Sequence, residues 1–267
     1  MCTVNVNSLV SKLHSVFNLI EDHNLDVISI TETWLTKEYA TSLVDLPAFN
    51  FYRGDTAGTV RKHGAGLYIS KRLSATLIEL PIPNIVAVFL TELDVYILSI
   101  YRPPSNGLEE NTQLLQFLQD FSRGREIVIM GDFNLPSISW ENDGFGPGYV
   151  NPVDRSFRDC FASCGLLQWV RCGTFFPSGN ILDLVLTSEG DRVYDVECAP
   201  PLPGCYHSPV LFKVIFQLCE SGEEVVEARS WSRGDYVAMS DRLFEVDWVF
   251  LFEEQSASDC YQKFCET

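Results

Sequence analysis

Residues 127–134 read IVIMGDFN, an apolar and largely β-branched run that ends in a glycine followed directly by an acid, an aromatic and an amide. The apolar part is too short for a stable helix and predicts a buried strand. Gly131 permits a tight backbone at the end of this strand. Because residues two apart in an extended chain point the same way, we expect Asp132 and Asn134 to face one cleft while Phe133 packs beneath them.

Asp132 and Asn134 have the chemistry of a site that handles phosphate. A carboxylate can orient or deprotonate water, and an amide offers a donor and an acceptor from one planar group, which suits a tetrahedral oxyanion. The alternative is structural, because Gly-Asp-x-Asn is also good turn chemistry and the strand could end in an ordinary Asx turn. This segment alone leaves both interpretations open.

The composition fits a globular protein with one main domain. The chain has 267 residues, of which 46% are hydrophobic and 12% aromatic, so it can bury a large core. No run approaches the ~20 apolar residues that cross a bilayer, and the first residues lack the basic and apolar blocks of a leader. We therefore expect no membrane partner and a location in the nucleus or cytoplasm. The nine cysteines are scattered and form no CxxC pair, which favours free, mostly buried thiols over disulfides or zinc.

The formal net charge of −17 is unusual for a protein that binds nucleic acid, because backbone binding normally uses clustered Lys and Arg. Residues 220–267 hold twelve acidic and four basic residues, so −8 of the charge lies there and −9 in residues 1–219. A hydrolase that meets phosphate through a cation can keep an acidic cleft, because the metal supplies the local positive charge.

A second strand end also carries an acid. Residues 3–7 alternate like a strand and lead into a predicted helix, and residues 27–31 form a strand that brings Glu32 out at its end. The alternative for Glu32, in TETWLT, is an acid at the start of a helix near a threonine cap. The inner face of the first helix is expected to be formed by Leu13, Val16, Phe17 and Ile20.

A third strand end carries a phenol. The runs 85–93 and 95–101 are expected to pair as a hairpin, and Pro103 and Pro104 stop the ladder just past Tyr101. The alternative for Tyr101 is an aromatic that caps the core.

The glycine-rich segment 54–66 lies between predicted strands 49–53 and 66–70. It lacks the Gly-Lys-Ser/Thr ending of a P-loop, and His63 within it is expected to be solvent-exposed rather than a ligand.

Residues 112–121 and 155–164 are each predicted to form a helix. The segment ILDLVLTS, which contains Asp183, is predicted to form a strand. An unpaired carboxylate inside an apolar strand would be expensive to bury. His207, which stands in CYHSPV at the head of the strand-like run PVLFKVIF, is the expected partner. The carboxylate would fix the tautomer of the ring and raise its basicity. The alternative is a solvent-exposed histidine before a strand.

From residue 220 the chain becomes acidic and polar, with Trp231 and Trp248 in weak helical patterns, as in a linker with docking helices.

These residues come in an order that resembles the endonuclease/exonuclease/phosphatase superfamily, with its DNase I-like and apurinic-endonuclease-like members. The order is Asn5, Asn7, Glu32, Tyr101, Asp132, Asn134, Asp183 and His207. The closest resemblance is to the endonuclease domain of LINE-type (non-LTR) retrotransposons. It spans roughly residues 3–216 and rests on six motifs: NVNSLVSKL, ITETWL, GAGLYIS, IYRPPS, GDFNLP and ILDLVLTS.

The resemblance implies an α/β (α+β) fold for residues 1–219, a DNase I-like four-layer sandwich of two mixed β-sheets flanked by helices. Residues 220–267 resemble the acidic helical connector that leads to a reverse transcriptase, which is absent from this chain. The implied activity is DNA phosphodiester hydrolysis that depends on Mg²⁺ or Mn²⁺, with nicking for target-primed reverse transcription. Two alternatives are a catalytically degenerate remnant that keeps the fold, and a phosphatase or phosphodiesterase that acts on a small molecule or a lipid.

The resemblance also implies roles for the residues of one half of the site. Glu32 matches the principal metal ligand, and Asn7 occupies a position near that metal. Asn5 matches an amide close to the catalytic acid, and Asp132 matches the residue that positions or activates the attacking water.

For the other half of the site, Asn134 and Tyr101 match residues that contact phosphate oxygens. His207 would stabilise the pentacoordinate phosphate or act as acid and base, oriented by Asp183. The chain departs from the family pattern at Tyr206, because relatives read Ser-Asp-His where this chain reads Cys-Tyr-His. The missing acid supports the metal or its water in relatives, which predicts a weakened enzyme.

Overall fold

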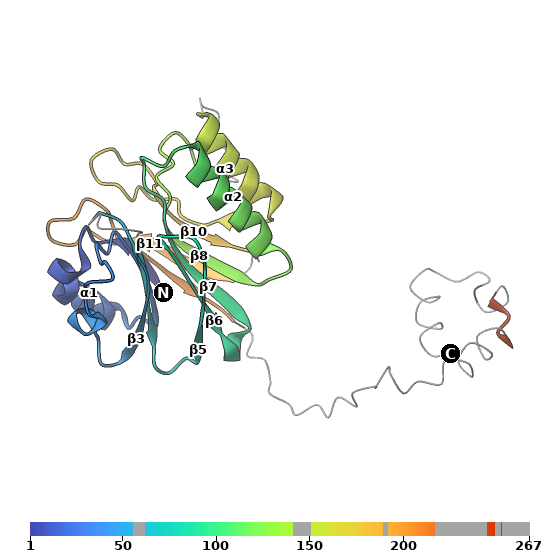
Figure 1. Cartoon of the computed structure of the whole chain (residues 1–267), viewed down its shortest axis with the longest axis horizontal. Coiled ribbons are helices and arrows are strands. Elements are labelled where there is room, and N and C mark those ends of the chain that lie inside the picture. Colours follow the sequence, from blue (N-terminus) through green and yellow to red (C-terminus); the bar gives the residue numbers. More distant parts are fainter. Residues whose placement is uncertain (56–61, 141–150, 189–191, 217–244, 249–251, 253–267) are drawn as a thin grey trace. The chain divides into compact units, whose positions relative to one another are not determined.

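The computed structural model describes residues 1–55, 62–140, 151–188, 192–216, 245–248 and 252 (Figure 1). The chain divides into two compact units, Met1–Cys219 and Glu220–Thr267. Most of the second unit, including Trp231, lies outside the described residues, so its nature as a connector stays a prediction. Among the described helices, none has the length and apolar character that a bilayer span requires.

The first sheet of the Met1–Cys219 unit has six strands in the order β11-β12-β1-β2-β4-β3. Strands β1 and β2 are parallel, and the other neighbours are antiparallel. The bounds are β1 Cys2–Asn5, β2 Val27–Thr31, β3 Phe49–Gly54, β4 Ala65–Ser70, β11 Val193–Cys198 and β12 Val210–Val214.

The second sheet also has six strands, in the order β5-β6-β7-β8-β10-β9. Strands β7 and β8 are parallel and are joined through helix α2, Leu108–Ser122, while the other neighbours are antiparallel. The bounds are β5 Ala75–Ile78, β6 Ile85–Leu90, β7 Val95–Tyr101, β8 Ile127–Asp132, β9 Leu167–Gln168 and β10 Asp183–Thr187.

Three apolar cores hold four layers together. In β8, Val128 and Met130 face the core between the two sheets, whereas Ile127 and Ile129 face the core under the helices α2 and α3. The helix α3 spans Pro152–Ser163. Both faces of β8 are therefore buried, which explains why its sequence is continuously apolar rather than alternating.

The helix α1, Leu9–His23, covers the outer face of the first sheet together with the short 3₁₀ helix η1, Thr41–Val44. Figure 1 shows α1 on one side of the paired sheets and α2 with α3 on the other. The predicted four-layer sandwich of two mixed sheets flanked by helices is thus confirmed.

Several predicted elements match closely and others need correction. The strand at 27–31 and the hairpin of β6 with β7 are confirmed, but β6 ends at Leu90 and a 3₁₀ turn, Thr91–Leu93, follows it. The helix α1 buries Leu9 and Leu19, whereas Phe17 is 41% exposed, so its place on the inner face was wrong. Strands β5, β9 and β11 were not predicted, because they are short and largely polar or half-exposed.

The preference for free thiols over disulfides was wrong for one pair of cysteines. Cys172 and Cys198 form a disulfide that ties the segment after β9 to the end of β11, with their Cα atoms 6.1 Å apart. Cys2 and Cys160 are free and buried as predicted. The pairing depends on two segments that meet only in the folded chain, so cysteine spacing could not indicate it.

Candidate active site

The strand topology brings the predicted polar residues to one edge of the sandwich. Parallel strands β1 and β2 end together at Asn5 and Thr31, and parallel strands β7 and β8 end together at Tyr101 and Asp132. Antiparallel strand β10 begins at this same edge, where Asp183 pairs directly with Asp132.

Asp132 is fully buried at the carboxyl end of β8 and uses its two oxygens differently. Its Oδ1 atom accepts a hydrogen bond from the backbone N–H of Asn134 at 3.1 Å, which is the Asx turn. Its Oδ2 atom accepts from Nδ2 of Asn5 at 2.9 Å. Both interpretations are therefore correct: the segment forms an Asx turn, and Asp132 also contacts the other polar residues of the site. Gly131 before it has φ +140°, and a Cβ there would lie 2.0 Å from the carbonyl oxygen of Ile100.

Glu32 lies just after β2 with φ 52°, and residues 33–40 form no helix, so the alternative of a helix-start acid is wrong. Its Oε1 atom accepts from Nδ2 of Asn5 at 2.9 Å and from the Tyr101 hydroxyl at 3.3 Å. Its Oε2 atom accepts from Nε1 of Trp34 at 3.3 Å. Trp34 was not predicted, although it stands two residues after Glu32 in the TETWLT motif.

Asn5 connects the two sheets at the site. Its Nδ2 atom donates to both Glu32, which follows a strand of the first sheet, and Asp132, which ends a strand of the second. Its Oδ1 atom accepts from the backbone N–H of Asn7 at 3.1 Å, while the Asn7 side chain is exposed. The backbone of Asn7 thus supports the site directly.

Asp183 and His207 lie in contact, with Nδ1 of the ring 2.7 Å from Oδ2 of the carboxylate. The His207 side chain is 12% exposed, so the alternative of a solvent-exposed histidine is wrong. Thr174 positions both residues, although the sequence did not indicate it. Its Oγ1 atom accepts from the backbone N–H of Asp183 at 3.0 Å, and its carbonyl accepts from that of Ser208 at 2.7 Å.

The electrostatics of these buried groups favour proton exchange near neutral pH. Burial raises the pKa of Asp132, and the Asp183 carboxylate raises it further, while His207 and the Asn5 amide oppose the rise. Burial lowers the pKa of His207, but the Asp183 carboxylate outweighs this, and the net effect raises the pKa to about 9. An acid with a raised pKa beside a protonated imidazole is typical of catalytic sites.

The donor set fits a hard divalent cation. Asp132, Asp183 and His207 each offer one ligand atom, and these atoms lie within 4.8 Å of one another. The Oδ1 atom of Asp183 is buried without a hydrogen-bond partner among the described residues. Together with the carboxylate of Glu32, the site is dominated by oxygen ligands, which Mg²⁺ and Mn²⁺ prefer.

Asn134 lies beside the carboxylates with φ 49° and donates from Nδ2 to the carbonyl of Arg102 at 3.0 Å. Arg102, which is 5% exposed, donates in return to the carbonyls of Phe133 and Asn134 at 3.1 and 3.0 Å. This buried guanidinium therefore fixes the segment after β8. Its place directly after Tyr101, ahead of the two prolines, was a signal that sequence reasoning missed.

Comparison with known proteins assigns most of the sequence to one family. A model of the Endonuclease/Exonuclease/phosphatase family matches residues 2–205. The chain belongs to this family. Among curated proteins, none matches the sequence.

Solved structures of a 3′ phosphatase and of two endonucleases share the fold at low sequence identity. The 3′ phosphatase NExo from Neisseria, bound to product DNA hairpin, has a TM-score of 0.62 at 17% identity, over 80% of this chain and 98% of that chain. The AP endonuclease LMAP from Leishmania major has a TM-score of 0.65 at 16% identity, over 80% and 87%. The endonuclease domain of TRAS1, a telomere-specific non-LTR retrotransposon, has a TM-score of 0.59 at 14% identity, over 81% and 98%.

His63 lies beside Tyr101 of the candidate site. Its ring centroid is 5.7 Å from that of Tyr101, and its carbonyl accepts from the backbone N–H of Trp34 at 2.9 Å. The residue is half-buried, so the expectation of a solvent-exposed loop histidine was wrong. The following glycine, Gly64, fixes this approach, because its N–H donates to Oδ1 of Asn84 at 3.0 Å.

Tyr206, the departure from the family pattern, lies at the outer rim of the site. Tyr206 is 64% exposed, and its carbonyl accepts a hydrogen bond from the backbone N–H of Phe176 at 2.9 Å. Its ring lies 6.5 Å from that of Phe175 between centroids. Tyr206 is therefore mostly exposed and precedes His207 directly in the chain.

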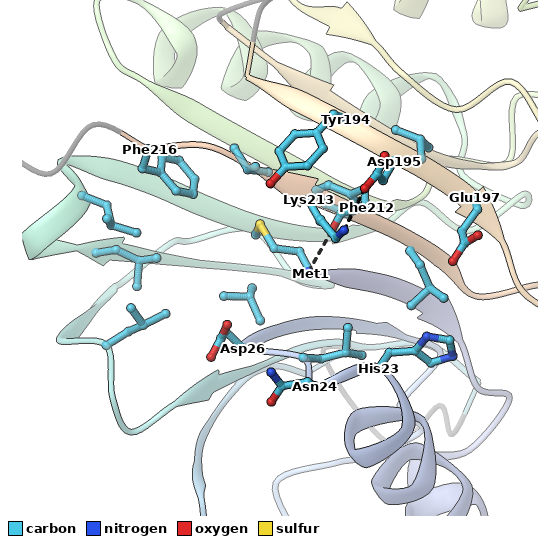
Figure 2. A pocket seen from close by; sticks show the side chains of 18 of the residues that line it. Met1, His23, Asn24, Asp26, Tyr194, Asp195, Glu197, Phe212, Lys213 and Phe216 are labelled. Carbon is cyan, nitrogen blue, oxygen red and sulfur yellow. Dashed lines mark hydrogen bonds and ion pairs between the residues drawn. The ribbon is translucent and has the colours of Figure 1, made fainter.

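Two cavities lie at different places in the fold, one next to the candidate site and one away from it. One of about 460 Å³ adjoins the site and is lined by Arg102, Asn106 and Asn134 among others. A larger one of about 870 Å³ lies at the opposite ends of the strands, where Met1, Asp26 and Lys213 line it (Figure 2). Lys213 and Asp195 form a salt bridge of 2.7 Å there. None of the predicted site residues lines the larger cavity, so it is separate from the chemistry.

Proposed function

We propose that this chain is a divalent-metal-dependent DNA endonuclease, derived from a non-LTR retrotransposon, that nicks DNA for target-primed reverse transcription. The observation that carries the proposal is the Asn5 amide that joins the carboxylates of Glu32 and Asp132 beside the Asp183–His207 pair. One cleft thus holds a candidate metal ligand, a water-activating acid and a phosphate-binding imidazole. The family match supports hydrolysis, and the likeness to the TRAS1 endonuclease domain supports the fold of such an element.

In this proposal the carboxylate of Glu32 would hold Mg²⁺ or Mn²⁺, with Asn7 close by. When bound, the cation supplies positive charge to the scissile phosphate and stabilises the charge that develops on its oxygens. This local charge reconciles an acidic protein with a polyanionic substrate, because the attraction comes from the site rather than from a basic surface.

Asp132 orients the attacking water and takes up its proton. The raised pKa of this buried carboxylate suits that role, because a general base works best when its pKa lies near the working pH. The hydrogen bonds from Asn5 and from the Asn134 backbone hold both oxygens in place, so the carboxylate faces the reacting group without rotation. Asn134 and Tyr101 contribute contacts to phosphate oxygens at the same strand ends.

His207 binds the phosphate from the opposite side. Because Asp183 engages Nδ1, the Nε2 atom points into the cleft, where it lies 3.9 Å from Oδ2 of Asp132. A protonated ring there stabilises negative charge on the phosphate or donates a proton to the leaving oxygen. We place the substrate, DNA, in this cleft and the protein in the nucleus or cytoplasm.

A second candidate is a catalytically degenerate remnant that retains the fold. The exposed phenol of Tyr206 at the rim favours it, because the family acid expected at this position would contribute negative charge near the cation. The fold and the buried hydrogen bonds described above do not depend on that acid.

Plasmid nicking with Mg²⁺ and with EDTA tests the proposal. We expect nicking with Mg²⁺, none with EDTA, and a loss of at least about 100-fold in Glu32→Ala, because a primary ligand is removed. Glu79→Ala is the matched control, since Glu79 is exposed and lies beyond β5. Undiminished nicking in EDTA, or a Glu32→Ala variant as active as the control, would refute the metal-dependent mechanism. A chain that binds Mg²⁺ without nicking under any condition identifies the degenerate remnant.

A further inference from the structure

His63 places an imidazole on the side of the active site that Glu32 and Tyr101 form. Its ring centroid lies 5.7 Å from that of Tyr101, whose hydroxyl donates to Oε1 of Glu32 at 3.3 Å. Burial lowers the pKa of His63, and the charge of the Glu32 carboxylate opposes this shift, so the ring lies within the field of that carboxylate. The ring therefore belongs to the site by its position, although the family resemblance implies no role for it.

The backbone joins His63 to the segment that carries Glu32. The carbonyl oxygens of His63 and of the glycine after it accept hydrogen bonds at 2.9 and 3.3 Å from the backbone N–H groups of Trp34 and Thr33. These bonds follow directly on the antiparallel pairing of β4 with β2. The backbone of His63 is thus fixed relative to the acid, and the contact with Tyr101 fixes the ring.

The ring nitrogens of His63 are not committed to the protein. Neither has a hydrogen-bond partner among the described residues, and neither is one of the buried atoms that lack a partner, so both are accessible to solvent. The donors around Glu32 are instead engaged. Nδ2 of Asn5, Nε1 of Trp34 and the hydroxyl of Tyr101 all donate to its carboxylate. His63 therefore offers an N–H group that remains available to a bound substrate.

A phosphate oxygen of the nucleic-acid backbone is the substrate group that suits this donor. Side-chain donors that contact phosphate oxygens fix the position of a protein on DNA. Residues 1–219 carry a formal charge of −9, so donors inside the site have to supply contacts that a basic surface supplies in other proteins. His207 offers one donor beside Asp132 and Asp183, and His63 offers another beside Glu32.

We propose that His63 is a further substrate-contacting residue, whose ring N–H donates a hydrogen bond to a phosphate oxygen of the DNA strand on the Glu32 side of the site. This inference rests on the proposed function for the identity of the substrate. A strand that is held by one imidazole beside Glu32 and by another beside Asp183 has less freedom to shift in the site, which favours a productive position. His63 thus acts in binding and positioning, and the proton transfers remain with Asp132 and His207.

The histidine ring signals in NMR spectra of the full chain test this contact without cleavage. The chain has four histidines, and the probe is a short DNA duplex that is titrated in EDTA, where the proposed function predicts no nicking. We expect the signals of His63 and His207 to shift. The signals of His14 and His23, which are exposed on α1, should stay unchanged. The signal that is missing in His63→Gln identifies His63.

Matched variants separate the hydrogen bond from packing against Tyr101. His63→Phe keeps a ring beside Tyr101 and removes the donor, whereas His63→Gln removes the ring and keeps an N–H donor. In nicking with Mg²⁺ we expect His63→Phe to raise KM by about 10- to 100-fold, because a hydrogen bond to a charged group is lost. The value of kcat should change little, because the contact is present in the ground state and in the transition state.

Two further variants complete this comparison. His63→Gln should recover part of the affinity, and His14→Ala, at an exposed position of α1, should behave like the native chain. Thermal unfolding of each variant shows whether it is folded.

The outcomes separate this inference from the proposed function. A His63 signal that stays unchanged while that of His207 shifts would overturn the contact. A His63→Phe variant with the native KM would overturn it too, since packing would then explain the residue, and nicking by the native chain leaves the proposed function intact in both cases. If both signals shift in a chain that never nicks, the contact stands and the proposed activity fails. If neither signal shifts, the contact is refuted, and nicking alone decides the proposed function.

Discussion

The Nδ1 atom of His207 lies 2.7 Å from the Oδ2 atom of Asp183, and the carboxylate is fully buried. The contact determines both the direction in which Nε2 points and the pH at which the ring loses its proton. It therefore links the geometry of the site to its pH dependence.

Asp183→Asn should move the alkaline limb of the pH–rate profile to lower pH. In the native chain the Asp183 carboxylate raises the pKa of His207 to about 9, so the ring stays protonated through neutral pH and loses its proton as the pH rises through that value. Without this charge, burial lowers the pKa of His207, so the ring loses its proton, and activity begins to fall, at a lower pH than in the native chain. The measurement is the nicking rate from pH 6 to 10, with Asp195→Asn as the surface control. An alkaline limb that does not move would show that His207 is not the group whose protonation matters.

Asn5→Ala should destabilise the folded chain and shift the acid limb to higher pH. The amide donates to the carboxylates of both Glu32 and Asp132, and its bond to Asp132 lowers the pKa of that acid. Its loss leaves buried acceptors unsatisfied, at a cost of about 1–3 kcal/mol, and removes one of the two opposing influences on the Asp132 pKa. Urea unfolding and the pH–rate profile measure both effects. Asn50→Ala, at an exposed position of β3, is the control, and equal stability of the two variants would contradict the bridging role.

Tyr206→Asp should strengthen Mg²⁺ binding. The acid that the family resemblance implies at this position would add negative charge and accept hydrogen bonds from bound water, and a phenol does neither as well as a carboxylate. We expect about a 10- to 100-fold gain in metal affinity, measured by calorimetry and by plasmid nicking with Asp132→Ala as the inactive reference. The exposed position tolerates the smaller side chain. A native chain that already nicks well, with affinity unchanged or lower in the variant, would show that the phenol does not weaken the enzyme.

Removing the disulfide should lower the free energy of unfolding in oxidising buffer. The Cys172–Cys198 bond closes a loop with a sequence separation of 26, worth about 3 kcal/mol in the chain-entropy account. The double variant Cys172→Ser/Cys198→Ser should lose that amount, and the native chain should lose it when a reductant is added. Guanidinium unfolding with and without reductant measures the difference. If reductant leaves the native midpoint unchanged, the bond contributes nothing to stability.

Sequence reasoning placed the strand ends because each combines a short apolar run with a polar residue at its end. Glu32 follows β2 and Asp132 ends β8, and the parallel pairing in each sheet brings each acid to the edge where its neighbouring strand also ends. Asp183 was traced to His207 because a carboxylate in an apolar strand requires a partner.

The remaining parts of the site depend on contacts between distant segments. Asn5 and Asp132 are 127 residues apart and meet only when the two sheets face each other. Thr174 and Arg102 act through backbone groups of their neighbours, and such contacts leave no pattern of hydropathy. The short strand β9 is too brief to show an alternation, and β11 has a single buried residue, Val193.

The pairing of β1 with β12 has a consequence for the order in which the protein matures. Cys2 pairs with Leu211 and Thr3 pairs with Val210, so one edge of β1 stays unpaired until β12 has left the ribosome. Contacts across such a separation form late and slowly. During synthesis Asn5 is present from the beginning, but the imidazole that faces it across the cleft arrives only with residue 207. The candidate site therefore lacks one of its central side chains until synthesis has passed His207.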